Sequence, residues 1–339
     1  MDKAAWKSLL GWIAHLSATV LIALLVVACL PGLAFAQDTA PPTFVSGPTA
    51  NPGGWTNADT ITITWTATDD TTPEAVTAEY RIDSSEDLDF TPDDGPLVLD
   101  IVSLGLLDGK HTVDIRITDA AGNPAVASVD IYVDRTAPSP FTATANPATW
   151  TKGPVMIAFE TTDPGAEDMP QTGSGIDYYS VTVDGIGDQG EQFGAFPLDT
   201  TAYPSGIYTV RVTAHDIAGN TTTSSVNVQV DNDPPAAFDA TPDTTDWTKN
   251  DVSVSFLTFD PLLGSGIVDH YEVSIDGGPY VPCTSPYTMT LEGPRTLVIR
   301  ALDSAAPEAN IRECNAPITT LIDKTPPQLD GFFGWGDSG

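Results

Sequence analysis

The residues of this chain that could do chemistry are mostly carboxylates. Its 339 residues include 46 Asp and Glu but only 13 Lys and Arg, which gives a formal net charge of −33. Carboxylates gathered at one place repel one another unless a cation lies among them, and a ligand set made only of oxygen favours calcium. The composition therefore suggests bound cations, with solubilising charge as the alternative.

An internal repeat organises the chain. Trp-Thr pairs begin at Trp55, Trp150 and Trp247, which are 95 and 97 residues apart. An alternating apolar run with Thr or Ser between the apolar residues follows each pair, and this pattern is typical of a half-buried β-strand. The string Asp-x-Ala-Gly-Asn ends a later alternating run at Asp119 and again at Asp216. Because the tryptophans recur at equivalent places, we expect them to pack in a shared core or edge motif; a sugar-stacking surface is the alternative.

The number and length of the strands indicate the fold class. About seven short strands in each 95-residue repeat are typical of an immunoglobulin-like β-sandwich, and the Pro-rich strings that close each repeat mark its boundaries. We predict an all-β protein with three tandem immunoglobulin-like β-sandwich domains after an N-terminal signal peptide. The predicted divisions are a signal peptide at 1–36, a linker at 37–40, Ig-like domains at 41–134, 135–231 and 232–323, and a tail or the truncated start of a further segment at 324–339.

The repeated strings resemble a known family. The strings W-T-x, T-x-T-D, Y-x-V-x-x-D-G, D-x-A-G-N and V-D-x-T-P-P look like those of bacterial Ig-like repeats, and the resemblance covers nearly all of residues 41–327. It implies a part in the stalk of a surface adhesin or an accessory module beside an extracellular enzyme. The third repeat departs from the pattern, because Ser-Ala-Ala-Pro-Glu-Ala-Asn310 follows Asp303 without the turn glycine. We expect a longer hairpin there.

The topology of such a sandwich predicts which aspartates meet. The loops after its second and sixth strands lie at one end, beside the N-terminal linker. We therefore predict calcium sites at the two junctions between repeats. The predicted ligands are Asp134, Asp163 and Asp216 at the first junction, and Asp231, Asp233, Asp260 and Asp303 at the second. The alternative for the Asp-x-Ala-Gly-Asn aspartates is that they only cap a turn.

The N-terminal segment is typical of an export signal. Lys3 and Lys7 precede an apolar stretch without charge, and Ala34-Phe35-Ala36 is a small-x-small cleavage site, so cleavage is predicted between Ala36 and Gln37. An uncleaved membrane anchor and lipidation of Cys29 are the alternatives. All three place the rest of the chain outside the cytoplasm, secreted or on the cell surface.

Two cysteines remain after the predicted cleavage. Cys283 and Cys314 both belong to the third repeat. In an oxidising compartment such a pair favours one disulfide, and two free thiols is the alternative.

Several function classes are disfavoured. The acidic balance argues against nucleic-acid binding, and contact with a membrane is expected only through an uncleaved signal or a lipidated Cys29. His111, His215 and His270 lie at different places in their repeats, and no nucleophile or metalloprotease motif is present. We predict a non-enzymatic stalk, spacer or adhesion module with an unknown protein or polysaccharide as its surface ligand. The alternative is an accessory carbohydrate- or protein-binding region of a larger secreted enzyme.

Overall fold

The computed structural model describes residues 38–70, 76–84, 86, 89–93, 95–164 and 173–328. The predicted cleavage between Ala36 and Gln37, the alternative lipidation at Cys29 and most of the predicted tail lie outside these residues. Within them the chain is almost entirely β, and the helix that is described is the single turn α2 (Ile101–Leu104). No described helix is long and apolar enough to span a bilayer. The all-β prediction is confirmed.

The first repeat forms two sheets. One has the strand order β1-β3-β6 and the other β2-β8-β7-β4-β5. Ile61 and Ile63 of β3 are fully buried while the threonines beside them are not, so the predicted alternation is real. The strands are β1 (Thr43–Asn51), β2 (Trp55–Thr56), β3 (Thr60–Thr68), β4 (Thr77–Ile82), β5 (Thr91–Pro92), β6 (Leu97–Asp100), β7 (Gly109–Thr118) and β8 (Pro124–Val133).

The second repeat also has two sheets, which enclose their own core. The strand orders are β13-β10-β9 and β12-β11-β14-β15. Val155 and Ile157 of the first sheet pack with Val181, Val210 and Val212 of the second. Such apolar packing between two sheets is what an aligned sandwich provides. The strands are β9 (Thr144–Asn146), β10 (Val155–Ala158), β11 (Ile176–Val183), β12 (Gly187–Gln192), β13 (Phe196–Leu198), β14 (Gly206–Asp216) and β15 (Thr221–Val230).

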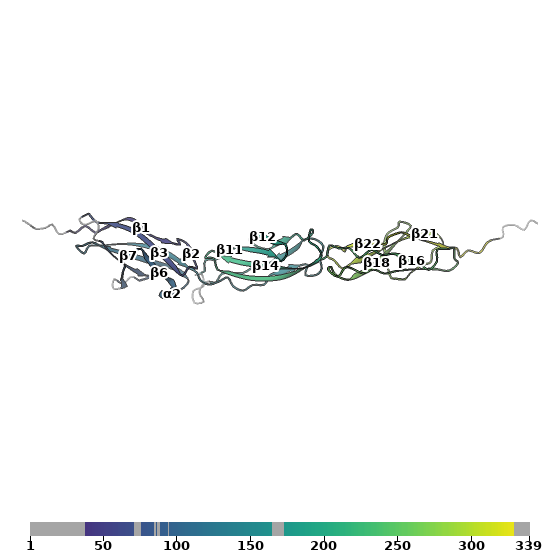
Figure 1. Ribbon diagram of the computed structural model, residues 1–339, viewed down its shortest axis with the longest axis horizontal. Helices are drawn as coiled ribbons and strands as arrows, with labels where there is room; N and C mark the ends of the chain where they lie inside the picture. The colour runs from purple at the N-terminus through teal and green to yellow at the C-terminus, as the bar shows by residue number, and fades with distance from the viewer. Residues whose placement is uncertain are drawn as a thin grey trace, which may run out of the picture. The chain divides into compact units, whose positions relative to one another are not determined.

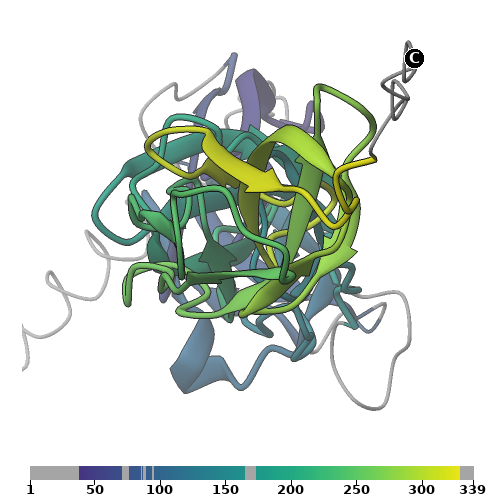
Figure 2. The same cartoon turned by 90° about the vertical axis from the view of Figure 1, so that its right-hand side faces the viewer.

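The third repeat follows the same plan with a separate core. Its sheets have the orders β16-β17-β20 and β19-β18-β21-β22, and β23 also pairs with β21. Val252 and Val254 pack with Val273, Leu297 and Ile299. Several of these strands are labelled in Figure 1 and are coloured green to yellow in Figure 2. They are β16 (Ala240–Pro242), β17 (Val252–Phe256), β18 (Val268–Ile275), β19 (Val281–Cys283), β20 (Tyr287–Met289), β21 (Gly293–Asp303), β22 (Ile311–Glu313) and β23 (Ile318–Ile322).

Contacts along the backbone divide the chain into two compact units. The first contains the described residues up to Gly53, with 59–104 and 111–131, and the second contains 54–58, 105–110 and the chain from Tyr132 onward. The second unit therefore holds both the second and the third sandwich. The predicted domain boundaries at 134, 231 and 323 stay a prediction.

The threonine of each Trp-Thr pair contacts the last strand of its own sandwich. Thr56, Thr151 and Thr248 each form a parallel pair or bridge with the last strand of their own repeat, at Val133, Val230 and Ile322 respectively. Trp55 packs beside Tyr132 with ring centroids 5.4 Å apart, as the packing prediction expected. Trp247 is 58% exposed. The prediction of core packing is therefore wrong for Trp247. The contact with the last strand, which all three repeats share, is made by the next residue, Thr248.

The long hairpin of the third repeat reaches the second sandwich. Ala306 forms a parallel bridge with Thr151, accepts a hydrogen bond from the amide of Lys152 at 2.8 Å and donates its own amide to the carbonyl of Trp150 at 3.0 Å. The hydroxyl of Thr151 donates to the same Ala306 carbonyl at 2.9 Å. The predicted lengthening of this hairpin is confirmed. The extra residues form a main-chain contact between neighbouring repeats.

The structure contradicts the predicted disulfide. Cys283 and Cys314 are both free thiols. Cys283 lies on β19, whereas Cys314 follows β22, and the sheet order places β18 and β21 between them. Three strand spacings amount to about 14 Å, and a disulfide needs Cα atoms no more than about 7 Å apart. Burial and nearby Glu272 raise the pKa of the Cys283 thiol to about 11, so the protonated thiol is favoured there.

Candidate metal centres

Three clusters of aspartates lie at the same place in the three repeats. In each, one carboxylate oxygen from each of three residues lies within 4.8 Å of the other two. One aspartate precedes the sandwich, one follows β3, β10 or β17, and one directly follows β7 or is the last residue of β14 or β21. The clusters are Asp38, Asp69 and Asp119; Asp134, Asp163 and Asp216; and Asp231, Asp260 and Asp303.

The third cluster is the most enclosed. Asp231, Asp260 and Asp303 are 0%, 1% and 2% exposed. Asp231 comes directly after β15, where its amide donates to the carbonyl of Thr151 at 2.8 Å and so fixes the start of the linker. Asp303 is the last residue of β21. Two strand ends and one linker thus bring three carboxylates to one buried point.

Backbone donors orient two of these carboxylates. The amide of Ser265 donates to Asp231 Oδ2 at 2.8 Å, and the amide of Gly266 donates to Asp260 Oδ2 at 2.9 Å. The other oxygen of each, Asp231 Oδ1 and Asp260 Oδ1, is buried without a hydrogen-bond partner. A buried carboxylate oxygen left in this way is costly, because nothing replaces its lost hydration. The two oxygens are therefore suited to a ligand that the protein itself does not provide.

An asparagine joins the linker to the sixth strand. The amide of Asn310 donates to Asp303 Oδ1 at 2.8 Å, and its side-chain Nδ2 donates to Asp303 Oδ2 at 2.8 Å and to the backbone carbonyl of Asp231 at 2.9 Å. One side chain thereby positions two of the three acids. Asp303 thus caps the long hairpin and also belongs to the cluster.

The second cluster repeats this arrangement. Ser174 donates its amide to Asp134 Oδ2 at 2.6 Å, and Gly175 donates its amide to Asp163 Oδ2 at 2.7 Å. Asn220 donates its Nδ2 to Asp216 Oδ2 at 2.9 Å and to the carbonyl of Asp134 at 2.9 Å. Asp163 Oδ1 is again buried without a hydrogen-bond partner.

The electrostatics of both clusters reflect crowding. Burial, followed by the charges of Asp134 and Asp216, raises the pKa of Asp163 above its ordinary value. Burial likewise raises the pKa of Asp260, and the charges of Asp231 and Asp303 add to it. Hydrogen bonds from Gly175 and from Ser265 and Gly266 oppose these shifts without reversing them. A cation among the carboxylates would offset the repulsion between their charges, which contributes to the raised pKa values.

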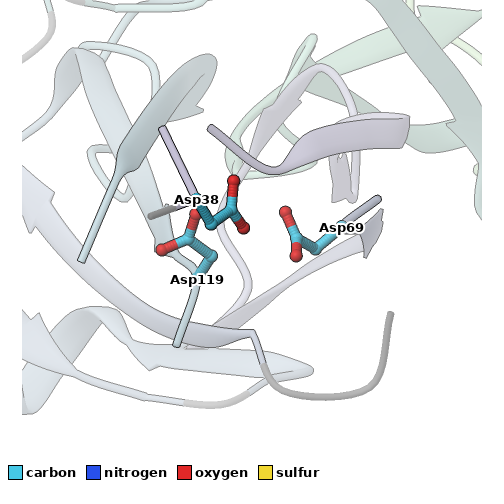
Figure 3. Close-up of side chains that lie close together, drawn as sticks. All are labelled: Asp38, Asp69 and Asp119. Atoms are coloured by element: carbon cyan, nitrogen blue, oxygen red, sulfur yellow. The ribbon is translucent and has the colours of Figure 1, made fainter. Parts of the chain in front are cut away.

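The first cluster was not predicted from the sequence. Figure 3 shows the carboxylates of Asp38, Asp69 and Asp119 pointing toward one another. Asn123 donates Nδ2 to Asp119 Oδ2 at 2.8 Å and to the carbonyl of Asp38 at 3.2 Å, as its counterparts do in the other repeats. Burial acts to raise the pKa of Asp119, but hydrogen bonds from Asn123, Ala121 and Gly122 outweigh it and the pKa lies below its ordinary value.

Calcium binding at the two junctions stays a prediction, whereas the positions of the predicted ligands can be compared with the structure. The structure brings together every aspartate predicted for the two junctions except Asp233, which is exposed and whose amide donates to Ser205 Oγ at 3.1 Å. Asp233 therefore lies outside the cluster, with its amide held by the second sandwich. Two other features of the clusters were not predicted: the asparagines, and the string Gly-Ser-Gly-Ile, which occurs at 173–176 and 264–267 and supplies the backbone amide donors.

The histidines occupy separate surroundings. His111 Nδ1 lies 2.5 Å from Asp83 Oδ2, and His270 Nδ1 lies 2.7 Å from Asp269 Oδ2. His215 Nε2 lies 2.9 Å from Ser180 Oγ, and its ring stacks on Tyr178. Asp216, its neighbour in sequence, points instead into the second cluster, as expected for adjacent strand residues.

No protein-family model and no curated protein matches the chain. Among solved structures it is similar to part of a 1.5-MDa bacterial ice-binding adhesin, at 14% identity and TM-score 0.38, covering 84% of this chain and 99% of that one. It is also similar to fibronectin(III)-like modules of CbhA from Clostridium thermocellum, at 17% identity and TM-score 0.32, covering 56% and 93%. A tetra-tandem repeat from a large adhesion protein matches at 22% identity and TM-score 0.27, covering 83% and 75%. Similarities of this size assign no function.

Proposed function

We propose that this chain is a non-catalytic, extracytoplasmic spacer of tandem Ig-like sandwiches whose repeats are stiffened by calcium at the three aspartate clusters. The observation that carries the proposal is the pair of oxygens Asp231 Oδ1 and Asp260 Oδ1. Both are buried, both lack a hydrogen-bond partner, and both belong to a cluster whose plan recurs in every repeat.

The donor set suits calcium. All three side chains in each cluster are carboxylates, and calcium accepts six to eight oxygen ligands in flexible geometry. Magnesium requires a small octahedral shell and retains its waters, so a buried site of three carboxylates supports it poorly. The donor set contains neither sulfur nor imidazole, which zinc and copper favour.

A cation at the third cluster would join elements that the chain must hold together. Asp231 belongs to the linker after the second sandwich, whereas Asp260 follows β17 and Asp303 ends β21 of the third. Binding there would fix the linker to the end of the third sandwich and would stabilise only the folded state. A spacer requires this kind of stiffness, and Pro-rich linkers alone supply it incompletely.

The placement of the histidines supports a non-catalytic role. A general base needs a nucleophile within reach and a group that orients it. Ser180 and His215 are within hydrogen-bonding distance, but both oxygens of Asp216 accept hydrogen bonds from Gly219 and Asn220 and so orient the turn.

The test is calorimetric titration of residues 37–339 with calcium, accompanied by small-angle scattering. We expect saturable binding in the range of extracellular calcium modules, about 0.1–1 mM or tighter. Asp163→Asn with Asp216→Asn should remove the second site only. Asp233→Asn is the control, because Asp233 is a linker acid that lies outside all three clusters, and this variant should bind as the wild type does. Absence of heat at millimolar calcium would leave the clusters as turn caps and refute the proposal.

A further inference from the structure

The second sandwich carries a cavity that neither the repeat pattern nor the aspartate clusters explain. Its volume is about 640 Å³, within the range of small-molecule sites. It lies where β10 ends, between the start of β9 and the connection from β12 to β13. The lining residues are Thr142, Thr144, Ala158, Phe159, Glu160, Tyr179, Phe193, Gly194 and Ala195.

Aromatic side chains form one part of the wall. Phe159 and Tyr179 are buried, with ring centroids 4.7 Å apart. The amide of Thr161 donates to the Tyr179 hydroxyl at 3.1 Å, which fixes that ring. Phe193, in contrast, is 79% exposed. A large apolar ring at the rim of a cavity offers a flat surface for stacking at little entropic cost.

The polar part of the lining consists of acceptors and hydroxyls. Glu160 is exposed and supplies a carboxylate, and Thr142 and Thr144 supply hydroxyl groups. Thr144 Oγ1 donates to the carbonyl of Ala158 at 3.4 Å, so its hydroxyl is left to act as an acceptor. None of the lining residues is basic. In a chain of net charge −33, such a site disfavours phosphates, sulfates and uronic acids.

The third sandwich shows that the fold does not require this chemistry. Phe159 and Phe256 occupy the same place in their repeats, as do Thr161 and Thr258, whose hydroxyls donate to the carbonyls of Ser139 and Ala236. The residue that corresponds to Glu160 is Leu257. The carboxylate at this place is therefore particular to the second sandwich.

We propose that this cavity binds a neutral saccharide unit. The apolar face of a sugar ring would stack on Phe193, and its hydroxyl groups would donate to the carboxylate of Glu160 and bond with Thr142 and Thr144. This function adds a ligand to the proposed spacer and does not depend on cation binding, since no residue of the three clusters lines the cavity.

The test is native gel electrophoresis of residues 37–339 through gels that contain a polysaccharide. The neutral set is a mannan, a β-glucan, a xylan and a galactan; the anionic set is polygalacturonate and dextran sulfate. We expect retardation by at least one neutral polysaccharide and by neither anionic one, equally in calcium and in chelator. Loss of retardation only in chelator would tie it to the cation sites and overturn the cavity assignment, whereas a spacer that binds no calcium would leave this result unchanged.

Variants locate the binding. Phe193→Ala should weaken retardation at least tenfold, and Glu160→Leu, which installs the residue of the third sandwich, should do the same. Ile207→Ala is the matched control, because Ile207 is an exposed apolar residue of β14 in the same sandwich outside the cavity. Absence of retardation by all four neutral polysaccharides, or retardation that survives Phe193→Ala, would overturn the proposal.

Discussion

The first and third aspartate clusters share one plan but differ in how completely the chain encloses them. Asp231, Asp260 and Asp303 are all buried, whereas Asp38 of the first cluster is partly exposed. In the third repeat the hydrogen bonds leave the pKa of Asp260 raised, and in the first repeat they leave the pKa of Asp119 lowered. Asp260 and Asp119 stand at different places in their clusters, so the enclosure is what distinguishes the two clusters: the more buried third cluster has the greater need of a cation.

The largest expected effect is on calcium affinity at the third cluster. Asp260→Asn removes a buried charge and an oxygen that lacks a partner, so we expect at least a hundredfold loss of affinity at that site. Asp119→Asn should weaken the first site less, because its oxygens already accept hydrogen bonds from Asn123. Calorimetric titration of both variants checks the order. Equal losses would show that enclosure does not control affinity.

A backbone substitution sharpens the same point without changing charge. A Cβ added at Gly264 would come within 2.4 Å of Asp231 Oδ1 and would displace that carboxylate. Gly264→Ala should therefore weaken calcium binding at the third cluster about tenfold. Gly47→Ala, where a Cβ meets nothing within 4 Å, is the control. Unchanged affinity in Gly264→Ala would mean that Asp231 Oδ1 is not a ligand.

Loss of the asparagine should destabilise the third repeat more than the first, just as loss of an aspartate should weaken calcium binding more at the third cluster. Asn310 is buried, and Asn310→Ala leaves the Asp231 carbonyl and Asp303 Oδ2 without their donor, at a cost of about 1–3 kcal/mol in unfolding free energy. Asn123→Ala should cost less, since Asn123 is only partly buried. Chemical denaturation in chelator measures both. Asn315→Ala, which removes a hydrogen bond between exposed residues, is the control.

The smallest effect is a difference in pH dependence without calcium. Because burial and neighbouring charges raise the pKa of Asp260, the folded state holds more protons than the unfolded state just above the ordinary carboxyl range. The contribution of Asp260 to stability therefore falls as pH rises through that window. Asp119 has a lowered pKa, so its contribution is present above the ordinary range and is lost as pH falls through the lowered value. Melting temperatures of Asp260→Asn and Asp119→Asn in chelator, followed against pH, should change in opposite directions relative to the wild type at neutral pH.

The strands could be predicted well because the alternation of apolar and polar residues in the sequence becomes an alternation of buried and more exposed side chains in the fold. Ile61 and Ile63, like Val155 and Ile157, are buried where the pattern places them. Two aspartate clusters were also predictable, since the sandwich topology fixes which loops share an end. Asp233 was not distinguishable from Asp231, because a linker without periodic hydrogen bonds gives no signal for which side chain turns inward.

Other features depend on the order of strands across a sheet, which the sequence does not display. Cys283 and Cys314 are 31 positions apart in the chain, but two intervening strands separate them in space. The asparagine of Asp-x-Ala-Gly-Asn can be read from the sequence, but the hydrogen bond from Asn220 to the linker carbonyl of Asp134, 86 residues earlier, cannot. The first cluster was missed because Asp38 was assigned only to the short N-terminal linker 37–40, although it stands where Asp134 and Asp231 stand before their own repeats.

The bridge between Thr151 and Ala306 has a consequence for how such an array can grow. The second sandwich contributes main-chain groups of Trp150 and Lys152 and the hydroxyl of Thr151 to this contact. The contact therefore depends little on which side chains flank the threonine. Trp247-Thr248-Lys249 presents the same sequence and the same parallel bridge to its own last strand. If a gene duplication placed a second copy of the third repeat after the first copy, the hairpin of the new copy would find the same kind of edge at Thr248. Lengthening the array therefore requires no compensating mutation in the repeat that accepts the newcomer.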